Sequence, residues 1–319
     1  MAYVNTKKSS LFLSKDGTLP TPPNGFIELT EEFTVNPKPT VEEFKRISTL
    51  LGGTDSYSDV CHTILDQDIE TVMRTNDKGG LALSTAPECS NLFSICGLDE
   101  TAGVDTVSYQ NSQAPAIGSA ILNIDGKQFS ATKSIIGDAT WEFEIGKPSL
   151  FKAKLNAFLD NYGVPEDVAI TPAELSDENI LMMACSDILL ADGEQLQADK
   201  ITIAMGVEVG KKYALGVKEY SISDYVIKIT ASFFVDSINY KDAIEKLGSQ
   251  DVEAISISLN TDKNGILQDG QSLKITAGSA KYSDFEDSTE ESVVKRDVTW
   301  LARPDATGTN ILFEYGLFA

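Results

Sequence analysis

The sequence contains little of the chemistry that metal sites and histidine-dependent enzymes use. Among its 319 residues there is one histidine, His62, and there are four cysteines without a Cys-x-x-Cys pair. Zinc and dithiol redox centres normally need such clusters. Because His62 directly follows Cys61, and neighbours in a strand point to opposite faces, we expect no Cys–His dyad. The sequence predicts no catalytic residue, no metal site and no cofactor.

Basic residues and long apolar runs are also scarce. Lysine and arginine total 26 against 48 aspartates and glutamates, which gives a formal net charge of −22. Proteins that hold nucleic acid through its phosphates need the opposite sign, so sequence-independent DNA or RNA binding is excluded. No apolar run reaches the roughly 18 residues of a membrane-spanning helix, and we expect no secretory signal. These features predict an acidic protein that is made and assembled in the cytoplasm.

Two-residue alternation of apolar and polar side chains is abundant, and it is typical of antiparallel strands with one buried face. It occurs in residues 141–145, 151–157, 225–233, 255–259, 273–277, 294–300 and 311–315. Asp-Gly pairs favour hairpin turns, in which both central positions have positive φ. They stand at residues 125–126, 192–193 and 269–270. The pattern predicts a mainly β fold, with aromatic residues of the stripes in its core: Trp141, Tyr225, Trp300 and Phe313.

Other signals predict an N-terminal arm and short helices. Prolines among polar residues predict an extended arm over residues 1–36. The capping box Thr40-x-x-Glu43 predicts a helix that ends at a Gly-Gly pair. Two short apolar-face helices are predicted at residues 89–96 and 240–247, each closed by glycine, and the first buries two cysteines.

The two short helices match each other at constant spacing, and the strand before each one also matches. The matched strand residues are Ile64, Asp66 and Ile69 with Ile222, Asp224 and Ile227. This pattern predicts a tandem duplication of a β-sandwich or barrel domain with a flanking helix. The predicted units are the arm over residues 1–36, a first domain over 37–163, a linker over 164–178 and a second domain over 179–319.

Three stretches resemble phage tail tube proteins: residues 199–247, which include DYVIKITASFFVDSINYKDAIEKL, residues 39–60 and residues 291–304. The resemblance covers about residues 39 to 304 and consists of apolar and turn patterns. It implies packed β-sheets and subunits that form stacked rings in a virion tail, around a channel through which DNA passes. A tape-measure protein and, in a contractile tail, a sheath are the implied partners; the sequence leaves open whether the tail is contractile. Single-domain members form hexamers, so a duplicated chain implies trimers with pseudo-sixfold symmetry.

Acidic residues are the candidates for the lining of such a channel, because carboxylates repel phosphates within about 8 Å at physiological salt. The candidates are Asp66, Asp68, Glu70, Glu142, Glu144 and Asp224. Alternatively, these residues form a solvated outer face, or the first three, which alternate along one strand, bind a cation. Acidic stretches at residues 284–287 and 290–291 are expected to be exposed loops between strands, or to dock a neighbouring ring.

Two other classes of protein compete with the tube subunit. A β-sandwich binding module, such as an adhesin or carbohydrate binder, requires an exposed aromatic platform, and none is evident. A hydrolase could use paired carboxylates such as Asp66 and Asp68, but carboxylates on one face of one strand do not flank a bond. The sequence therefore favours a self-assembling structural protein over an enzyme.

Overall fold

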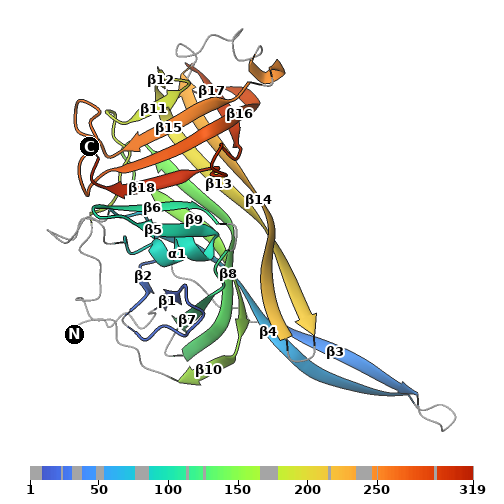
Figure 1. The fold of residues 1–319 in the computed structure, drawn as a ribbon. Coiled ribbons are helices and arrows are strands. Elements are labelled where there is room, and N and C mark those ends of the chain that lie inside the picture. The colour runs from blue at the N-terminus through green and yellow to red at the C-terminus, as the bar shows by residue number, and fades with distance from the viewer. Residues whose placement is uncertain are drawn as a thin grey trace.

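A computed structural model describes residues 9–22, 24–30, 38–47, 54–75, 86–112, 115–124, 127–165, 179–214, 217–234, 246–249, 251–290 and 293–318. Most of these residues belong to one large antiparallel sheet (Figure 1). Within the described residues, helix is confined to α1 (Ser90–Ile95) and a turn at residues 246–248. The mainly β fold is confirmed, as is the first short helix, in which Cys89 and Cys96 are buried.

The first half of the chain supplies ten strands. They are β1 (Ser9–Ser14), β2 (Phe26–Ile27), β3 (Lys38–Ile47), β4 (Thr54–Val72), β5 (Leu98–Ala102), β6 (Thr106–Asn111), β7 (Gly118–Ile124), β8 (Lys127–Glu144), β9 (Leu150–Leu159) and β10 (Asn161–Pro165). Seven of them pair in the order β2–β1–β7–β8–β9–β4–β3. Strand β10 follows β9 and pairs with the beginning of β8.

The second half supplies eight strands. They are β11 (Ile188–Ala191), β12 (Glu194–Leu196), β13 (Ala198–Ala214), β14 (Val217–Phe234), β15 (Glu253–Leu259), β16 (Leu273–Glu290), β17 (Val293–Ala302) and β18 (Leu312–Gly316). Seven of them pair in the order β12–β11–β15–β16–β17–β14–β13. Strand β18 follows β17 and pairs with the beginning of β16. The order of pairing therefore matches that of the first half, strand for strand.

The ladders of the two halves also correspond residue by residue. In β4, Cys61 is a bulge residue that lies four positions before Leu65, which pairs with Ala157 of β9. In β14, Ser223 is a bulge residue four positions before Ile227, which pairs with Ala302 of β17. Ile227 and Leu65 thus occupy equivalent ladder positions. The sequence analysis matched Ile227 with Ile69, which lies four residues farther along β4.

Two pairings connect the halves. The second part of β8 pairs with β13, from Ala139 opposite Met205 to Glu144 opposite Lys200. Strand β18 pairs with β6, so the C-terminal strand joins the first half. Two long hairpins, β3–β4 and β13–β14, leave the body of the molecule on the same side (Figure 1). The hairpins are the parts of the sheet that reach farthest from the core.

The core contains the apolar side of the predicted stripes. Phe93 of α1 lies 5.0 Å from Tyr109, 5.8 Å from Trp141 and 5.9 Å from Phe313, measured between ring centroids. Trp141, Trp300 and Phe313 are at most 1% exposed. Such a cluster of large rings contributes most of the apolar area that a half can bury. The prediction that the aromatic stripes form core is confirmed for these residues, whereas Tyr225 is half-buried.

Two predictions near the N-terminus are wrong. The capping box at Thr40 and Glu43 lies in β3, because the ten-residue ladder with β4 outweighs a local helix signal. The supposed arm over residues 1–36 contains β1 and β2, and β1 pairs with β7 through six residues. Leu11, Phe12 and Leu13 are fully buried, so the start of the described chain is an integral part of the sheet.

Turns and segment boundaries agree with the sequence in part. Asp192 and Gly193 both have positive φ, 52° and 82°, and connect β11 to β12 as predicted. The Asp-Gly pair at 269–270 instead lies in the connection before β16, and residues 125–126 lie outside the described residues. The acidic stretch 284–287 belongs to β16 and is not a loop. The predicted linker begins inside β10, and residues 166–178 lie outside the described residues.

Candidate functional site: a charged face of the sheet

The strand ladders place all six acidic candidates on one side of the sheet. Directly opposed residues of neighbouring strands point to the same side, as do residues two apart in one strand. The ladders run from β4 through β9 and β8 to β13 and β14. We call this surface the charged face, and its members are Asp66, Asp68, Glu70, Glu142, Glu144, Lys152, Lys154, Lys200, Asp224 and Lys228. Five of the six acids lie on β4 and β8, the two strands that flank β9 in the first half, and Asp224 lies farther out on β14.

Lys152 is the centre of a three-residue ionic contact on this face. Its ammonium nitrogen lies 2.8 Å from Glu142 Oε2 and 3.5 Å from Glu70 Oε2. The pKa of Lys152 is raised above its ordinary value, chiefly because the ammonium donates a hydrogen bond to Glu142. Glu70 also accepts a hydrogen bond of 2.7 Å from Thr30 Oγ1. All three charged groups are partly exposed, so the contact lies at the boundary with solvent.

Asp66 is covered by the second hairpin. Its Oδ1 atom lies 3.6 Å from Nζ of Lys211, a residue of β13 beyond the bulge. The side chains are 21% and 30% exposed. Nearby, the rings of Phe158 in β9 and Tyr220 in β14 stack with centroids 4.3 Å apart. The β13–β14 hairpin therefore crosses over the charged face at the level of Asp66, while Asp68 remains exposed.

The remaining acids differ in their surroundings. Asp68 is directly opposite Lys154 on β9. Glu144 is opposite Lys200 on β13, and its carboxylate lies 2.6 Å from Nζ of Lys147. Asp224 is exposed, and its Oδ1 accepts a hydrogen bond of 2.8 Å from the amide of the next residue. Carboxylates and lysines thus alternate across the face, instead of forming a uniformly acidic surface.

The geometry offers little for catalysis or metal binding. Within the part of the chain that the structure describes, no group of three or more histidine, cysteine, aspartate or glutamate side chains could hold a metal ion. Of the three carboxylates considered as a cation site, Asp66 and Glu70 lie within 4 Å of lysine ammonium groups, so their charge is already compensated. The face combines hydrated charge with a rigid sheet, which suits a surface that contacts other molecules without trapping them.

The sequence did not indicate that a lysine lies between the carboxylates of the face, although Lys152 and Lys154 alternate with apolar residues along a predicted strand.

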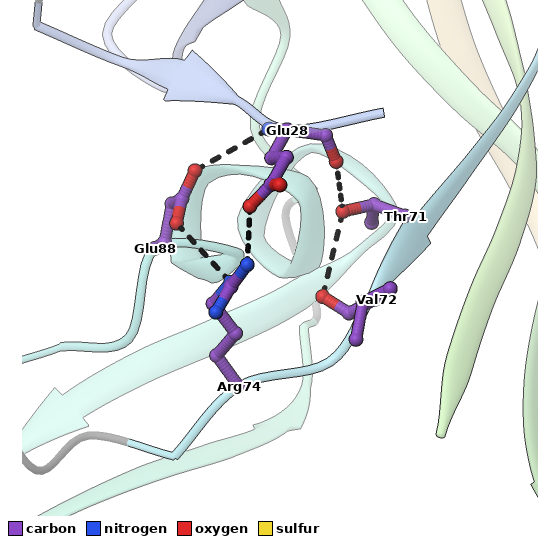
Figure 2. A network of polar contacts seen from close by, with 5 residues as sticks. All are labelled: Glu28, Thr71, Val72, Arg74 and Glu88. Atoms are coloured by element: carbon purple, nitrogen blue, oxygen red, sulfur yellow. Dashed lines mark hydrogen bonds and ion pairs between the residues drawn. The ribbon is translucent and has the colours of Figure 1, made fainter. Parts of the chain in front are cut away.

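The sequence also did not indicate a second ionic contact, which holds the segment after β2 against β4 (Figure 2). Arg74, after β4, forms ion pairs with Glu28 and with Glu88, the latter at 3.8 Å. Thr71 Oγ1 donates a hydrogen bond of 2.5 Å to the Glu28 carbonyl. These contacts join β2, β4 and the segment before α1.

Comparison with protein-family models and with characterised proteins finds no match to this chain. The described residues contain no helix that is long and apolar enough to span a membrane.

Proposed function

We propose that this chain is the structural subunit of a phage or phage-like tail tube. Three copies form a ring with pseudo-sixfold symmetry, and the rings stack around a channel through which DNA passes. In this proposal the chain is a tandem duplication of a tube domain, and each half contributes a two-layered β unit with a short flanking helix. A tape-measure protein inside the tube and, if the tail is contractile, a sheath outside it are the expected partners in the virion tail.

One observation carries this proposal: the order of strand pairing is the same in the two halves, and the halves are joined side by side through β8 and β13. A sheet made of two equivalent units in line can be continued by further units of the same kind. Such head-to-tail contacts between identical chains close into a ring when the rotation between neighbours allows closure. The tail tube resemblance over residues 39–304 supports the same conclusion from an independent source.

The charged face supports a role as channel lining. It includes strands of both halves, so a ring of three chains would present it three times. A DNA channel must not offer unpaired cations, because phosphate contacts and counterion release would hold the DNA. Lys152 and Lys211 each lie within 4 Å of a carboxylate. The lysines at these two contacts are therefore balanced by acids, while Lys228 of the face has no ion pair with a described residue.

Electron microscopy and native mass spectrometry of the purified chain test the proposal together. We expect rings or tubes with six similar features per ring, and a mass of three times the 34.5 kDa of one chain. Rings of six chains would contradict the trimer. A chain that stays monomeric at every concentration, and that binds a glycan or a cell surface, would instead support the binding-module alternative.

The lining has its own test. Tubes should not retain double-stranded DNA at physiological salt, whereas tubes carrying Glu70→Lys and Glu142→Lys should retain it in a salt-dependent manner. Both changes leave three lysines together at the Lys152 contact. If the variant tubes release DNA as readily as unmodified ones, the charged face does not line the channel.

A further inference from the structure

The junction between the two halves has two parts, and the first is the crossing of the second hairpin over the first-half sheet. Ile135 and Phe158 are nearly fully buried there, together with Tyr220, and Val209 and Ile222 pack against them. The hairpin lies so close to the sheet that a Cβ atom at Gly137 would be 3.3 Å from Val209 Cγ2.

The second part of the junction is strand pairing along one edge of β8. Strand β9 occupies one edge of β8, and β7 occupies the beginning of the other edge. Strand β13 continues along that second edge: Thr140 pairs with Lys152 of β9 on one side and with Ala204 of β13 on the other. The second half therefore completes an edge of the first half that β7 leaves open.

Strand β16 has the same arrangement without the occupant. Ala280 pairs with Glu253 of β15 on one edge and with Ala302 of β17 on the other. The pairing of β15 with β16 extends no farther than Ala280, whereas the pairing of β17 with β16 extends to Glu290. Along residues 286–290, therefore, one edge of β16 is paired with β17, and no strand in the described part of the chain pairs with its other edge. An unpaired edge of this kind is a template for another strand.

The ladders identify which hairpin of the chain is equivalent to the one that crosses the first-half sheet. Strand β3 is the counterpart of β13, and the β3–β4 bulge corresponds to the β13–β14 bulge. At the positions of Val209 and Ile222, which pack on the first-half sheet, β3 and β4 carry Val41 and Val60. The apolar character of these contact positions is thus retained in the first hairpin.

Two ionic contacts lie at the crossing: one joins Lys133 of β8 to Glu219 of β14 at 3.9 Å, and the other has an equivalent with its charges exchanged. In the chain, Lys211 of the second hairpin meets Asp66 of the first-half sheet. The position of Lys211 corresponds to Glu43 in β3, and the position of Asp66 corresponds to Lys228 in β14. Lys228 is exposed and has no ion pair with a described residue. The Lys211–Asp66 contact is therefore matched by an acidic hairpin position, Glu43, and a basic sheet position, Lys228.

We propose that the β3–β4 hairpin of a second copy of this chain docks across the sheet of the second half, with Glu43 against Lys228. This interface reproduces between chains the crossing that β13–β14 makes within one chain. It rests on the proposed ring assembly, and it specifies the surface by which one chain recognises the next.

Charge exchange tests the predicted contact. Glu43→Lys and Lys228→Glu should each raise the concentration at which rings form by about fivefold or more, because an attraction becomes a repulsion. The double variant should restore assembly to near the unmodified level. Lys263→Glu makes the same charge change in an exposed loop and should have no effect. Thermal unfolding below the assembly concentration should be the same for all of these variants.

Zero-length cross-linking between a nitrogen-15-labelled copy and an unlabelled copy provides a direct test. A carbodiimide should join Glu43 to Lys228 in peptides of mixed isotopic content, which identifies a bond between chains. Rings without this mixed cross-link, or single variants that assemble normally, would overturn the interface while leaving the tube proposal intact. A chain that forms no ring under any condition would refute both.

Discussion

The ion pair between Asp287 and Arg296 gives a prediction whose size follows from burial. The Arg296 side chain is 1% exposed, and its Nε and Nη2 atoms donate hydrogen bonds of 2.6 and 2.9 Å to the two carboxylate oxygens of Asp287. Breaking a buried pair by removing one partner commonly costs about 3–5 kcal/mol, because a charge is left in a poorly solvated place. Asp287 is 35% exposed, so we expect Asp287→Asn to lower the free energy of unfolding by about 2–4 kcal/mol.

Urea unfolding of the unassembled chain at pH 7 measures this loss, and the pH dependence checks its origin. Arg296 holds the pKa of Asp287 below its ordinary value, chiefly through the hydrogen bonds. A depressed carboxylate pKa stabilises the fold above the unfolded pKa of about 3.9 and loses this effect as the pH falls through the folded pKa. The difference between the unmodified chain and Asp287→Asn should therefore be full at pH 7 and shrink below about pH 4.

Two further variants make the reasoning refutable. Glu286→Gln removes the neighbouring exposed carboxylate and should change stability by less than about 0.5 kcal/mol. If Asp287→Asn is no more harmful than Glu286→Gln, the Arg296 charge is not dependent on its partner. Replacing both members of the pair by apolar residues, Asp287→Leu with Arg296→Met, should recover most of the loss, since no unpaired charge then remains.

Two other predictions concern the charged face and the C-terminal strand. Lys152→Met leaves Glu70 and Glu142 without their shared cation, so it should cost about 0.5–1 kcal/mol at pH 7. Because the pKa of Lys152 is raised, the difference should persist to about pH 10 and shrink only as the pH rises through the folded pKa; thermal unfolding across this range measures it. Gly316 has φ +119°, and a Cβ there would be 2.3 Å from a backbone oxygen, whereas Gly193 has φ +82° and open space. Gly316→Ala should cost more than about 2 kcal/mol and Gly193→Ala about 1 kcal/mol, and equal unfolding midpoints would contradict this.

The strands were predictable where their pattern is local. The stripe 151–157 needs only alternation to place Phe151, Ala153, Leu155 and Ala157 inside, and all four are buried. Strand β3 was not predictable in this way, because its partner is another strand and the capping box is a short-range signal. At the N-terminus the apolar run at residues 11–13 was a valid strand signal, but the prolines that follow it outweighed it in the prediction.

The charged face was predictable only within one strand. Asp66, Asp68 and Glu70 alternate, so their common side follows from the strand period alone. Their proximity to Glu142 depends on the register of β9 between β4 and β8, which no local pattern contains. The contact of Asp66 with Lys211 depends on a hairpin that crosses the sheet, and the duplicated pattern alone does not predict this crossing.

The opposite polarity of the two crossing contacts has a consequence for assembly. Within the chain, a lysine of the second hairpin meets Asp66, and in the proposed interface Glu43 of the first hairpin meets Lys228. If the second hairpin docked on the second half of another chain, Lys211 would face Lys228, and if the first hairpin docked on the first half, Glu43 would face Asp66. Both exchanges place like charges together, which disfavours wrong partners more than it strengthens correct ones. In the proposed ring of three chains, first and second halves would then alternate over six positions.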